Sequence, residues 1–129
     1  MITVESLEIH VSNHCNLSCR GCSHISPLEK KEFLNEENMY LVLKKLSSVL
    51  HCKVIRLLGG EPTLNSNLEN IVSKIKEIGI SDEISIPTNG ILISKLSENI
   101  LNNVSSENYN YISKKLDLIY EDFMEYCAY

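Results

Sequence analysis

The sequence of 129 residues contains no long apolar run, no arginine-rich cluster, no internal repeat and no low-complexity segment. No stretch approaches the roughly 18 consecutive apolar residues of a membrane-spanning helix, which argues against an integral membrane protein. The first residues lack the basic and apolar regions of a secretory signal peptide, so we expect a cytoplasmic protein. With ten lysines, only two arginines and a net charge of −5, the composition indicates neither a nucleic-acid partner nor a membrane partner.

Five cysteines stand out in an otherwise ordinary composition, which is 43% hydrophobic and 22% charged and fits one globular domain. Three of them, Cys15, Cys19 and Cys22, fall within eight residues. Thiols stay reduced in the cytosol, so this cluster indicates metal binding or redox chemistry rather than disulfides. We interpret Cys52 as a buried thiol, and we assign no role to Cys127.

The apolar pattern predicts strands that alternate with helices. Strands are expected over about 4–12, 53–58 and 83–88, and helices over about 36–50, 68–78, 94–102 and 107–126. Asn35 stands before two acids at the start of the first helix, and Ser66 with Glu69 matches a capping box for the second. Gly79 lies where a helix-terminating glycine is expected.

This order of elements predicts an α/β fold with a parallel sheet built from right-handed βαβ units. In such folds the functional groups gather beyond the carboxyl ends of the strands. Those ends carry the cysteine cluster, the segment Gly59-Gly60-Glu61-Pro62 and the segment Thr88-Asn89-Gly90. We therefore expect three unusual segments to meet at one edge of the sheet.

The C-x3-C-x2-C spacing of the cysteines is typical of a metal-binding loop. Thiolates are soft ligands that suit iron–sulfur clusters and zinc. Three cysteines leave the fourth ligand position open, and in a closed zinc site either His14 or His24 could fill it. The spacing alone leaves an iron–sulfur cluster and zinc equally open.

Three other features allow both a functional and a structural interpretation. Paired glycines let the backbone approach a ligand closely, and they also serve a tight turn. Asn-Gly is a common turn signal. Arg56 lies in a strand that is otherwise predicted to be buried. It either faces a barrel interior and meets cofactor or substrate, or forms an ion pair with Glu8 or Glu61.

Taken together, the three segments resemble the motifs of the radical S-adenosylmethionine (radical SAM) enzyme family. The resemblance extends over about residues 5–95 and keeps the order, spacing and strand context of all three motifs. It implies that three irons of a [4Fe-4S] cluster are held by Cys15, Cys19 and Cys22, and that the fourth iron binds S-adenosylmethionine. It also implies two sets of cofactor contacts: Gly59, Gly60, Glu61 and Pro62 at the methionine amino group, and Thr88 and Asn89 along the same cavity.

The implied reaction is a one-electron reduction of the cluster by a reductant such as a flavodoxin or ferredoxin. S-adenosylmethionine would then be cleaved to a 5′-deoxyadenosyl radical, which abstracts a hydrogen atom from an unknown substrate. The alternative is a non-catalytic iron–sulfur or zinc-binding remnant or subunit that acts by association.

Two departures from the family pattern bear on this choice. Gly21 stands where many members have an aromatic residue that meets the adenine. A full (β/α)8 barrel takes about 250 residues, so a six-unit partial barrel takes about 190. We therefore expect residues 1–129 to form a single, incomplete radical SAM domain: a truncated partial (β/α) barrel of parallel strands with a helical tail over 94–126.

The fourth strand should follow residue 100, but the segment there is too polar and too brief to predict one. An incomplete sheet exposes an edge, and exposed edges invite pairing with a partner chain that completes the sheet. We expect the chain alone to lack turnover or to need such a partner.

Overall fold

The computed structural model describes residues 1–19, 22 and 28–104. The six main elements are β1 (Ile2–Ser12), α1 (Glu36–Leu46), β2 (Leu50–Gly59), α2 (Leu68–Ile78), β3 (Ser81–Ser85) and α3 (Glu98–Asn103). Two single turns of 3-10 helix, Pro62–Leu64 and Ile93–Lys95, follow β2 and precede α3. The predicted helical tail over 107–126 and Cys127 lie outside the described residues.

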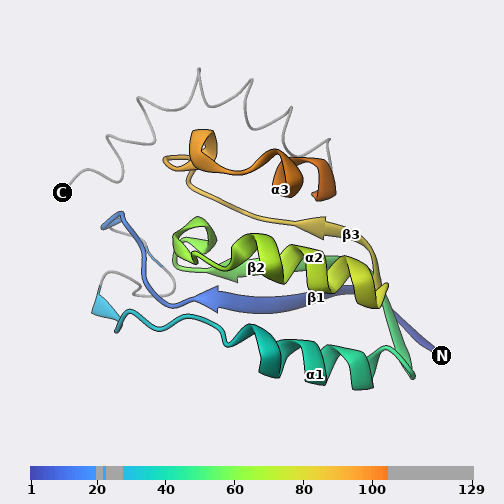
Figure 1. Ribbon diagram of the computed structural model, residues 1–129. Helices are drawn as coiled ribbons and strands as arrows, with labels where there is room; N and C mark the ends of the chain where they lie inside the picture. Colours follow the sequence, from blue (N-terminus) through green and yellow to red (C-terminus); the bar gives the residue numbers. More distant parts are fainter. Residues whose placement is uncertain (20–21, 23–27, 105–129) are drawn as a thin grey trace.

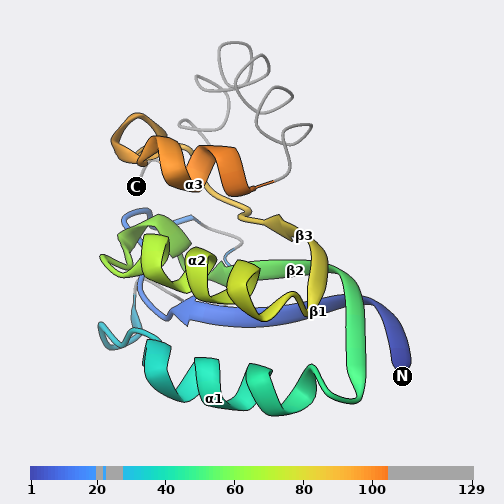
Figure 2. The ribbon, with the colours of Figure 1, turned by 45° about the vertical axis from the view of Figure 1, so that its right-hand side comes forward.

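The sheet is parallel, and its strands follow one another in the order β1-β2-β3. The β1–β2 register runs from Ile2 opposite Leu50 to Ser12 opposite Gly59, with an irregularity between His10 and Ser12. Helices α1 and α2 lie on one face of the sheet and α3 lies beside α2 (Figures 1 and 2). Sequential order with helices on one face is the arrangement of a barrel wall, so the α/β prediction is confirmed.

The core lies between the sheet and its helices. The buried apolar residues come from all three strands and all three helices: Val11, Met39, Leu43, Cys52, Ile55, Leu57, Leu68, Ile71, Val72, Ile75, Ile80, Ile84 and Ile100. Apolar residues three and four apart on α2 give this helix one continuous buried stripe. The prediction of Cys52 as a buried thiol is confirmed, and burial raises the pKa of this thiol.

The opposite face of the sheet carries charge. Arg56 Nη1 lies 3.8 Å from Glu8 Oε1, and the two side chains are 49% and 54% exposed. The predicted ion pair with Glu8 is therefore present, whereas the prediction that the whole second strand is buried was wrong at Lys53 and Arg56. A hollow of about 400 Å³ near this pair is lined by Glu5, Ser6, Lys53, Val54, Arg56, Asp82 and Glu83.

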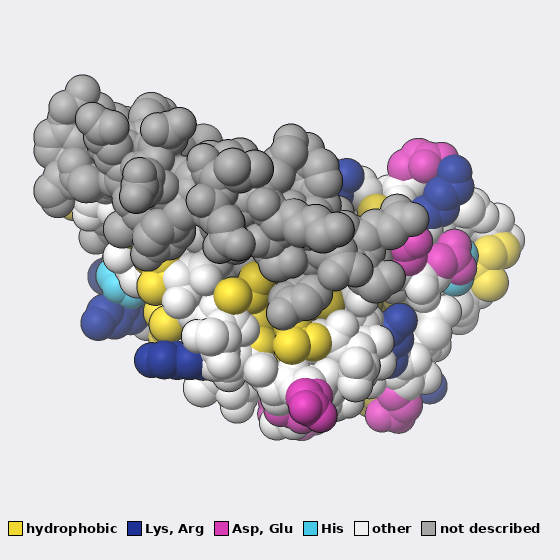
Figure 3. Space-filling model, turned by 90° about the horizontal axis from the view of Figure 1, so that it is seen from above, with side chains coloured by type: hydrophobic (Ala, Val, Ile, Leu, Met, Phe, Trp, Pro, Cys, Tyr) yellow, Lys and Arg dark blue, Asp and Glu magenta, His cyan; other side chains and the backbone are white. Residues whose placement is uncertain are grey.

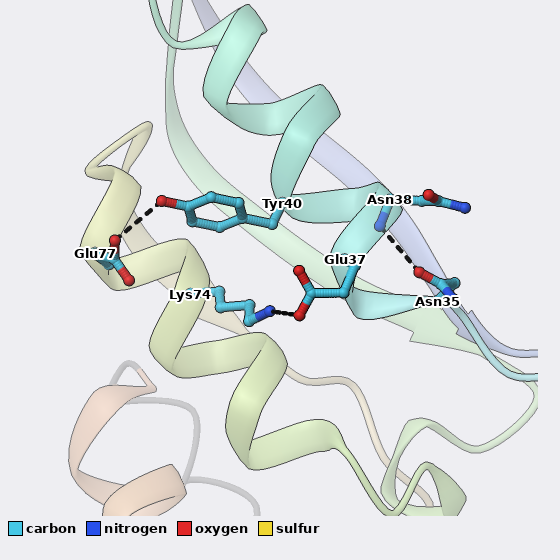
Figure 4. A network of polar contacts seen from close by, with 6 residues as sticks. All are labelled: Asn35, Glu37, Asn38, Tyr40, Lys74 and Glu77. Carbon is cyan, nitrogen blue, oxygen red and sulfur yellow. Dashed lines mark hydrogen bonds and ion pairs between the residues drawn. The ribbon is translucent and has the colours of Figure 1, made fainter.

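Helices α1 and α2 are tied together at their surface by polar contacts (Figure 4). The Tyr40 hydroxyl donates to Glu77 Oε1 at 3.0 Å, which raises the pKa of Tyr40 because Glu77 stabilises the protonated form. Lys74 Nζ lies 2.5 Å from Glu37 Oε1. At the start of α1, the Asn35 side chain accepts from the Asn38 N–H at 3.0 Å, as the predicted helix start requires.

The predicted end of α1 and the predicted bounds of β3 were wrong, because neighbouring segments limit both elements. Helix α1 ends at Leu46 instead of continuing to 50, because Leu50 already pairs with Ile2 in the sheet. Strand β3 spans Ser81–Ser85 instead of about 83–88. It stops short of Pro87, which has no N–H for the ladder.

Helix α2 has the predicted bounds, but its predicted cap and the predicted start of the next helix were wrong. The cap position of α2 is Asn67, and the Ser66 capping box is absent. The start of α2 has no side-chain cap; the Asn65 side chain instead accepts from the N–H of Asn67, the cap residue itself, at 2.9 Å. The helix expected over 94–102 is interrupted, because Ser97 starts α3 by accepting from the Ile100 N–H.

Hydrophobic side chains are exposed to view near the middle of the side that carries α3 (Figure 3). Figure 3 shows hydrophobic side chains gathered there, with charged side chains toward the rim of the same view. Within the part of the chain that the structure describes, no helix combines the length and the apolar character needed to cross a bilayer.

Among the described residues, β3 has a single neighbouring strand, β2. Residues 101–103, where a fourth strand was considered, belong to α3.

Candidate functional site

The carboxyl ends of the three strands meet at one edge of the sheet, as predicted from their order (Figure 1). The cysteine loop leaves this edge after β1, and the Gly59–Pro62 segment leaves it after β2. The Thr88–Asn89 segment follows β3 by a few residues. Hydrogen bonds join all three segments, so the predicted convergence is present in the described structure.

Position 59 must be a glycine because the backbone of β1 leaves no room for a side chain there. Its φ is +153°, and a Cβ built there would lie 2.0 Å from Ser12 O. Next to it, the Gly60 N–H donates to Ser12 O and the Glu61 N–H donates to His14 O, both at 2.9 Å. The paired glycines were interpreted either as a site of close approach by a ligand or as a tight turn; at Gly59 the group that approaches closely is the neighbouring strand.

Glu61 is 1% exposed, and its carboxylate is engaged by residues of the site itself. Oε1 accepts from the Thr63 and Thr88 hydroxyls, each at 2.5 Å, and from the Thr63 N–H at 3.2 Å. Oε2 accepts from the Asn89 N–H at 2.8 Å. This carboxylate therefore fastens the segment after β2 to the segment after β3.

Replacement of Glu61 with alanine is expected to lower the free energy of unfolding by about 2–4 kcal/mol. The variant leaves the partly buried N–H and O–H donors of Thr63, Thr88 and Asn89 without this acceptor. A hydrogen bond to a charged group contributes roughly 1.5–3 kcal/mol. Urea denaturation of the cofactor-free protein measures the difference. Glu69→Ala is the control, because Glu69 is exposed and accepts one hydrogen bond from Asn99; its cost should stay within about 0.5 kcal/mol. Equal costs for the two variants would contradict the role assigned to Glu61.

The three cysteines lie on one loop and are each partly buried. The Leu17 N–H donates to Cys15 Sγ at 3.4 Å, and the Cys22 N–H donates to Cys19 O at 3.3 Å. Burial raises the pKa of Cys15, with smaller effects in the same direction from Glu61, Cys19 and Cys22, while the Leu17 N–H opposes them. The loop thus keeps all three thiols partly buried, with a backbone N–H directed at Cys15.

This donor set fits an iron–sulfur cluster. A cluster takes thiolates as ligands, and its irons supply the positive charge that offsets their mutual repulsion. Backbone N–H groups that point at sulfur, as Leu17 does at Cys15, stabilise the same anionic form. Among the described residues, no three His, Cys, Asp or Glu side chains are arranged to hold a single metal ion.

His14, a predicted fourth ligand of a zinc site, lies in the same loop beside Cys15. Its Nδ1 is buried and finds no hydrogen-bond partner within the described part of the chain. His24, the other predicted ligand, and Gly21, the position of the missing aromatic residue, lie outside the described residues.

Asn89 reaches from the β3 side into the cysteine loop. Its Nδ2 lies 2.8 Å from Asn16 Oδ1 and 3.9 Å from Cys15 Sγ. Sequence reasoning placed Asn89 along the cavity but missed Asn16 and Thr63, which complete the hydrogen-bond network. Thr63 follows the Gly59–Pro62 segment directly, and Asn16 lies between the predicted ligands Cys15 and Cys19. These positions were the only features of the sequence that could have indicated a role in the site.

Comparison with known protein families gives a match over most of the chain. The family model of the radical SAM superfamily matches residues 9–127. The chain is 41% identical over 92 residues to a probable GTP 3′,8-cyclase of Methanothermobacter marburgensis, covering 71% of this chain and 30% of that protein. It is 30% identical over 129 residues to the GTP 3′,8-cyclase of Syntrophomonas wolfei subsp. wolfei, covering 89% and 39%. The chain thus spans about three to four tenths of the length of these relatives.

Solved structures show the same arrangement of elements. Streptococcus suis SuiB, crystallised with S-adenosylmethionine, aligns with a TM-score of 0.60 at 24% identity, covering 75% of this chain and 21% of that one. This likeness concerns the fold alone. Native anSMEcpe with bound AdoMet and a peptide aligns with a TM-score of 0.51 at 28% identity, covering 67% and 25%.

Proposed function

The chain belongs to the radical SAM superfamily, and on that premise we propose that Cys15, Cys19 and Cys22 hold a [4Fe-4S] cluster whose fourth iron takes S-adenosylmethionine. The cofactors of this superfamily are such a cluster and S-adenosylmethionine, as the motifs predicted. One observation carries the proposal for this chain: the three motif segments, far apart in sequence, are hydrogen-bonded to one another at one edge of the sheet.

Each segment has a distinct task in the proposed site. The three thiolates bind iron, and the Leu17 N–H stabilises the charge on Cys15. Backbone groups of the segment Gly59–Pro62, together with Glu61, hold the ammonium group of S-adenosylmethionine, while Thr63, Thr88 and Asn89 fix the Glu61 carboxylate in place. Thr88 and Asn89 form the wall on the β3 side.

When bound, the cluster and S-adenosylmethionine supply one-electron cleavage to a 5′-deoxyadenosyl radical for hydrogen abstraction. An electron donor of the flavodoxin or ferredoxin class fits this step. The curated relatives act, by their names, on GTP. We confine the proposed activity to the cofactor step, because the chain spans only 30% to 39% of their length.

Anaerobic reconstitution with iron and sulfide tests the proposal. We expect about four irons per chain and, after reduction with dithionite, an electron paramagnetic resonance (EPR) signal of a [4Fe-4S] cluster. Addition of S-adenosylmethionine should change this signal, because the cofactor binds directly to the fourth iron. A colourless protein with one stoichiometric zinc would overturn the proposal in favour of a zinc-binding protein that acts by association. A cluster signal that does not change on addition of S-adenosylmethionine would contradict the proposal that the fourth iron binds this cofactor.

A further inference from the structure

We propose that the side-chain amide of Asn89 donates a hydrogen bond to the cluster ligand Cys15 and thereby raises the reduction potential of the cluster. This inference rests on the proposed function, since it concerns a cluster held by Cys15. It assigns Asn89 a positioning and tuning role that is separate from any contact with S-adenosylmethionine.

The orientation of the Asn89 amide is fixed from both ends. Its Oδ1 accepts from the Ile91 N–H at 3.1 Å, so Nδ2 must point the other way. Nδ2 carries two hydrogens, and two acceptors lie within reach: Asn16 Oδ1 at 2.8 Å and Cys15 Sγ at 3.9 Å. One hydrogen is thus available for the sulfur without loss of the bond to Asn16.

The backbone of Asn89 is held equally firmly. Its N–H donates to Glu61 Oε2 at 2.8 Å, and Glu61 is 1% exposed. The Thr88 hydroxyl also donates to Glu61, and it accepts from the Gly90 N–H at 3.1 Å. A donor anchored in this way meets the sulfur without losing further conformational freedom, which makes it an effective source of a fixed dipole.

The sign of the effect follows from charge. Reduction adds one negative charge to the cluster, and part of it resides on the ligand sulfurs. An N–H that points at sulfur stabilises the reduced form more than the oxidised form, so it raises the potential. The buried Glu61 carboxylate accepts from the Asn89 N–H at 2.8 Å, so it lies beside this amide, and its negative charge acts in the opposite direction on the cluster. The Asn89 amide therefore offsets part of the effect of the Glu61 carboxylate on the reduction potential.

Two substitutions separate tuning from mere support. Asn89→Ala removes the donor. Asn89→Asp keeps the shape and the acceptor for the Ile91 N–H, but it replaces the donor with a negative oxygen. We expect an anaerobic, dye-mediated redox titration, followed by EPR without S-adenosylmethionine, to give the order wild type, Asn89→Ala, Asn89→Asp from highest to lowest potential. On the order of a tenfold change in the ratio of oxidised to reduced cluster, about 59 mV, is expected for Asn89→Asp.

Asn65 provides a matched control. It is 3% exposed, its Oδ1 accepts from the Asn67 N–H at 2.9 Å, and its Nδ2 donates to Val11 O at 2.8 Å. Asn65→Ala thus removes another side-chain amide with both ends engaged, whose Nδ2 donates to a backbone oxygen instead of a sulfur. We expect this variant to lose thermal stability and to keep the wild-type potential.

The possible outcomes are distinct. A wild-type potential in Asn89→Asp would overturn the inference, because this variant keeps the shape of the side chain and replaces the donor near Cys15 with a negative oxygen. Loss of the cluster from both Asn89 variants, with retention in Asn65→Ala, would make Asn89 a residue needed for assembly and would also overturn the tuning role. Failure of the proposed function is recognised separately, since the wild-type protein itself would then take up no cluster.

Discussion

The Cys19→Ala variant is expected to retain no [4Fe-4S] cluster after anaerobic reconstitution. Only three protein thiolates are proposed to hold the irons, and with one removed the cluster loses a ligand that no other described cysteine replaces: Cys52 is fully buried in the core on β2. Iron content should fall from about four per chain to below about one, and the EPR signal of the reduced protein should vanish.

Cys52→Ala is the control for this experiment. The Cys52 Sγ donates to Ile80 O at 3.5 Å inside the core, and it belongs to none of the three segments of the site. The variant should lose about 1–2 kcal/mol of stability through a small cavity and one lost hydrogen bond, while its cluster forms as in the wild type. A Cys19→Ala protein that still carries stoichiometric cluster would remove Cys19 from the ligand set.

The Gly59→Ala variant should be destabilised by roughly 2–6 kcal/mol, which combines about 1–3 kcal/mol of backbone strain with about 1–3 kcal/mol of forced overlap. The new Cβ would sit 2.0 Å from Ser12 O, a backbone atom that can move only if β1 moves. The same shift would pull apart the hydrogen bonds that Gly60 and Glu61 make to the start of the cysteine loop. Urea denaturation measures the loss, and cluster uptake should fall with it.

Gly79→Ala separates the two causes. Gly79 ends α2 with φ at +68°, and a Cβ built there meets nothing within 4 Å. Only the conformational strain remains in this variant, so its cost should be about 1 kcal/mol. If Gly59→Ala is no more destabilised than Gly79→Ala, the close approach to Ser12 does not govern that position.

The parallel sheet and the edge at which the site forms could be predicted because they depend on local patterns. Alternation over 4–12, the apolar run that ends at Gly59 and the stripe on α2 each reveal an element within a short window. Once the strands are parallel and sequential, their carboxyl ends must lie together. The sequence pattern alone therefore predicts that the cysteine loop, Glu61 and Asn89 lie at the same edge of the sheet.

The contacts themselves could not be predicted, because each joins residues that are distant in sequence. Nothing near Gly59 reveals that Ser12 O occupies the space of its Cβ. The engagement of Glu61 by Thr88 and Asn89 depends on how far past Ser85 the chain runs before it turns. The turn before α2 is held by the Asn65 side chain, which bonds both the Asn67 N–H and Val11 O, a distant partner that no capping rule considers.

The charged face of the sheet has a consequence for what can lie against it. The pairs Glu8–Arg56 and Glu5–Lys53 are exposed, so each contributes only about 0–1 kcal/mol and neither explains the stability of the fold. Covering these charges with a dry, apolar layer would cost far more than the pairs return, since both members of each pair would lose their hydration. The hollow of about 400 Å³ beside these pairs therefore favours water over apolar groups, and any molecule that binds there must carry polar groups of its own.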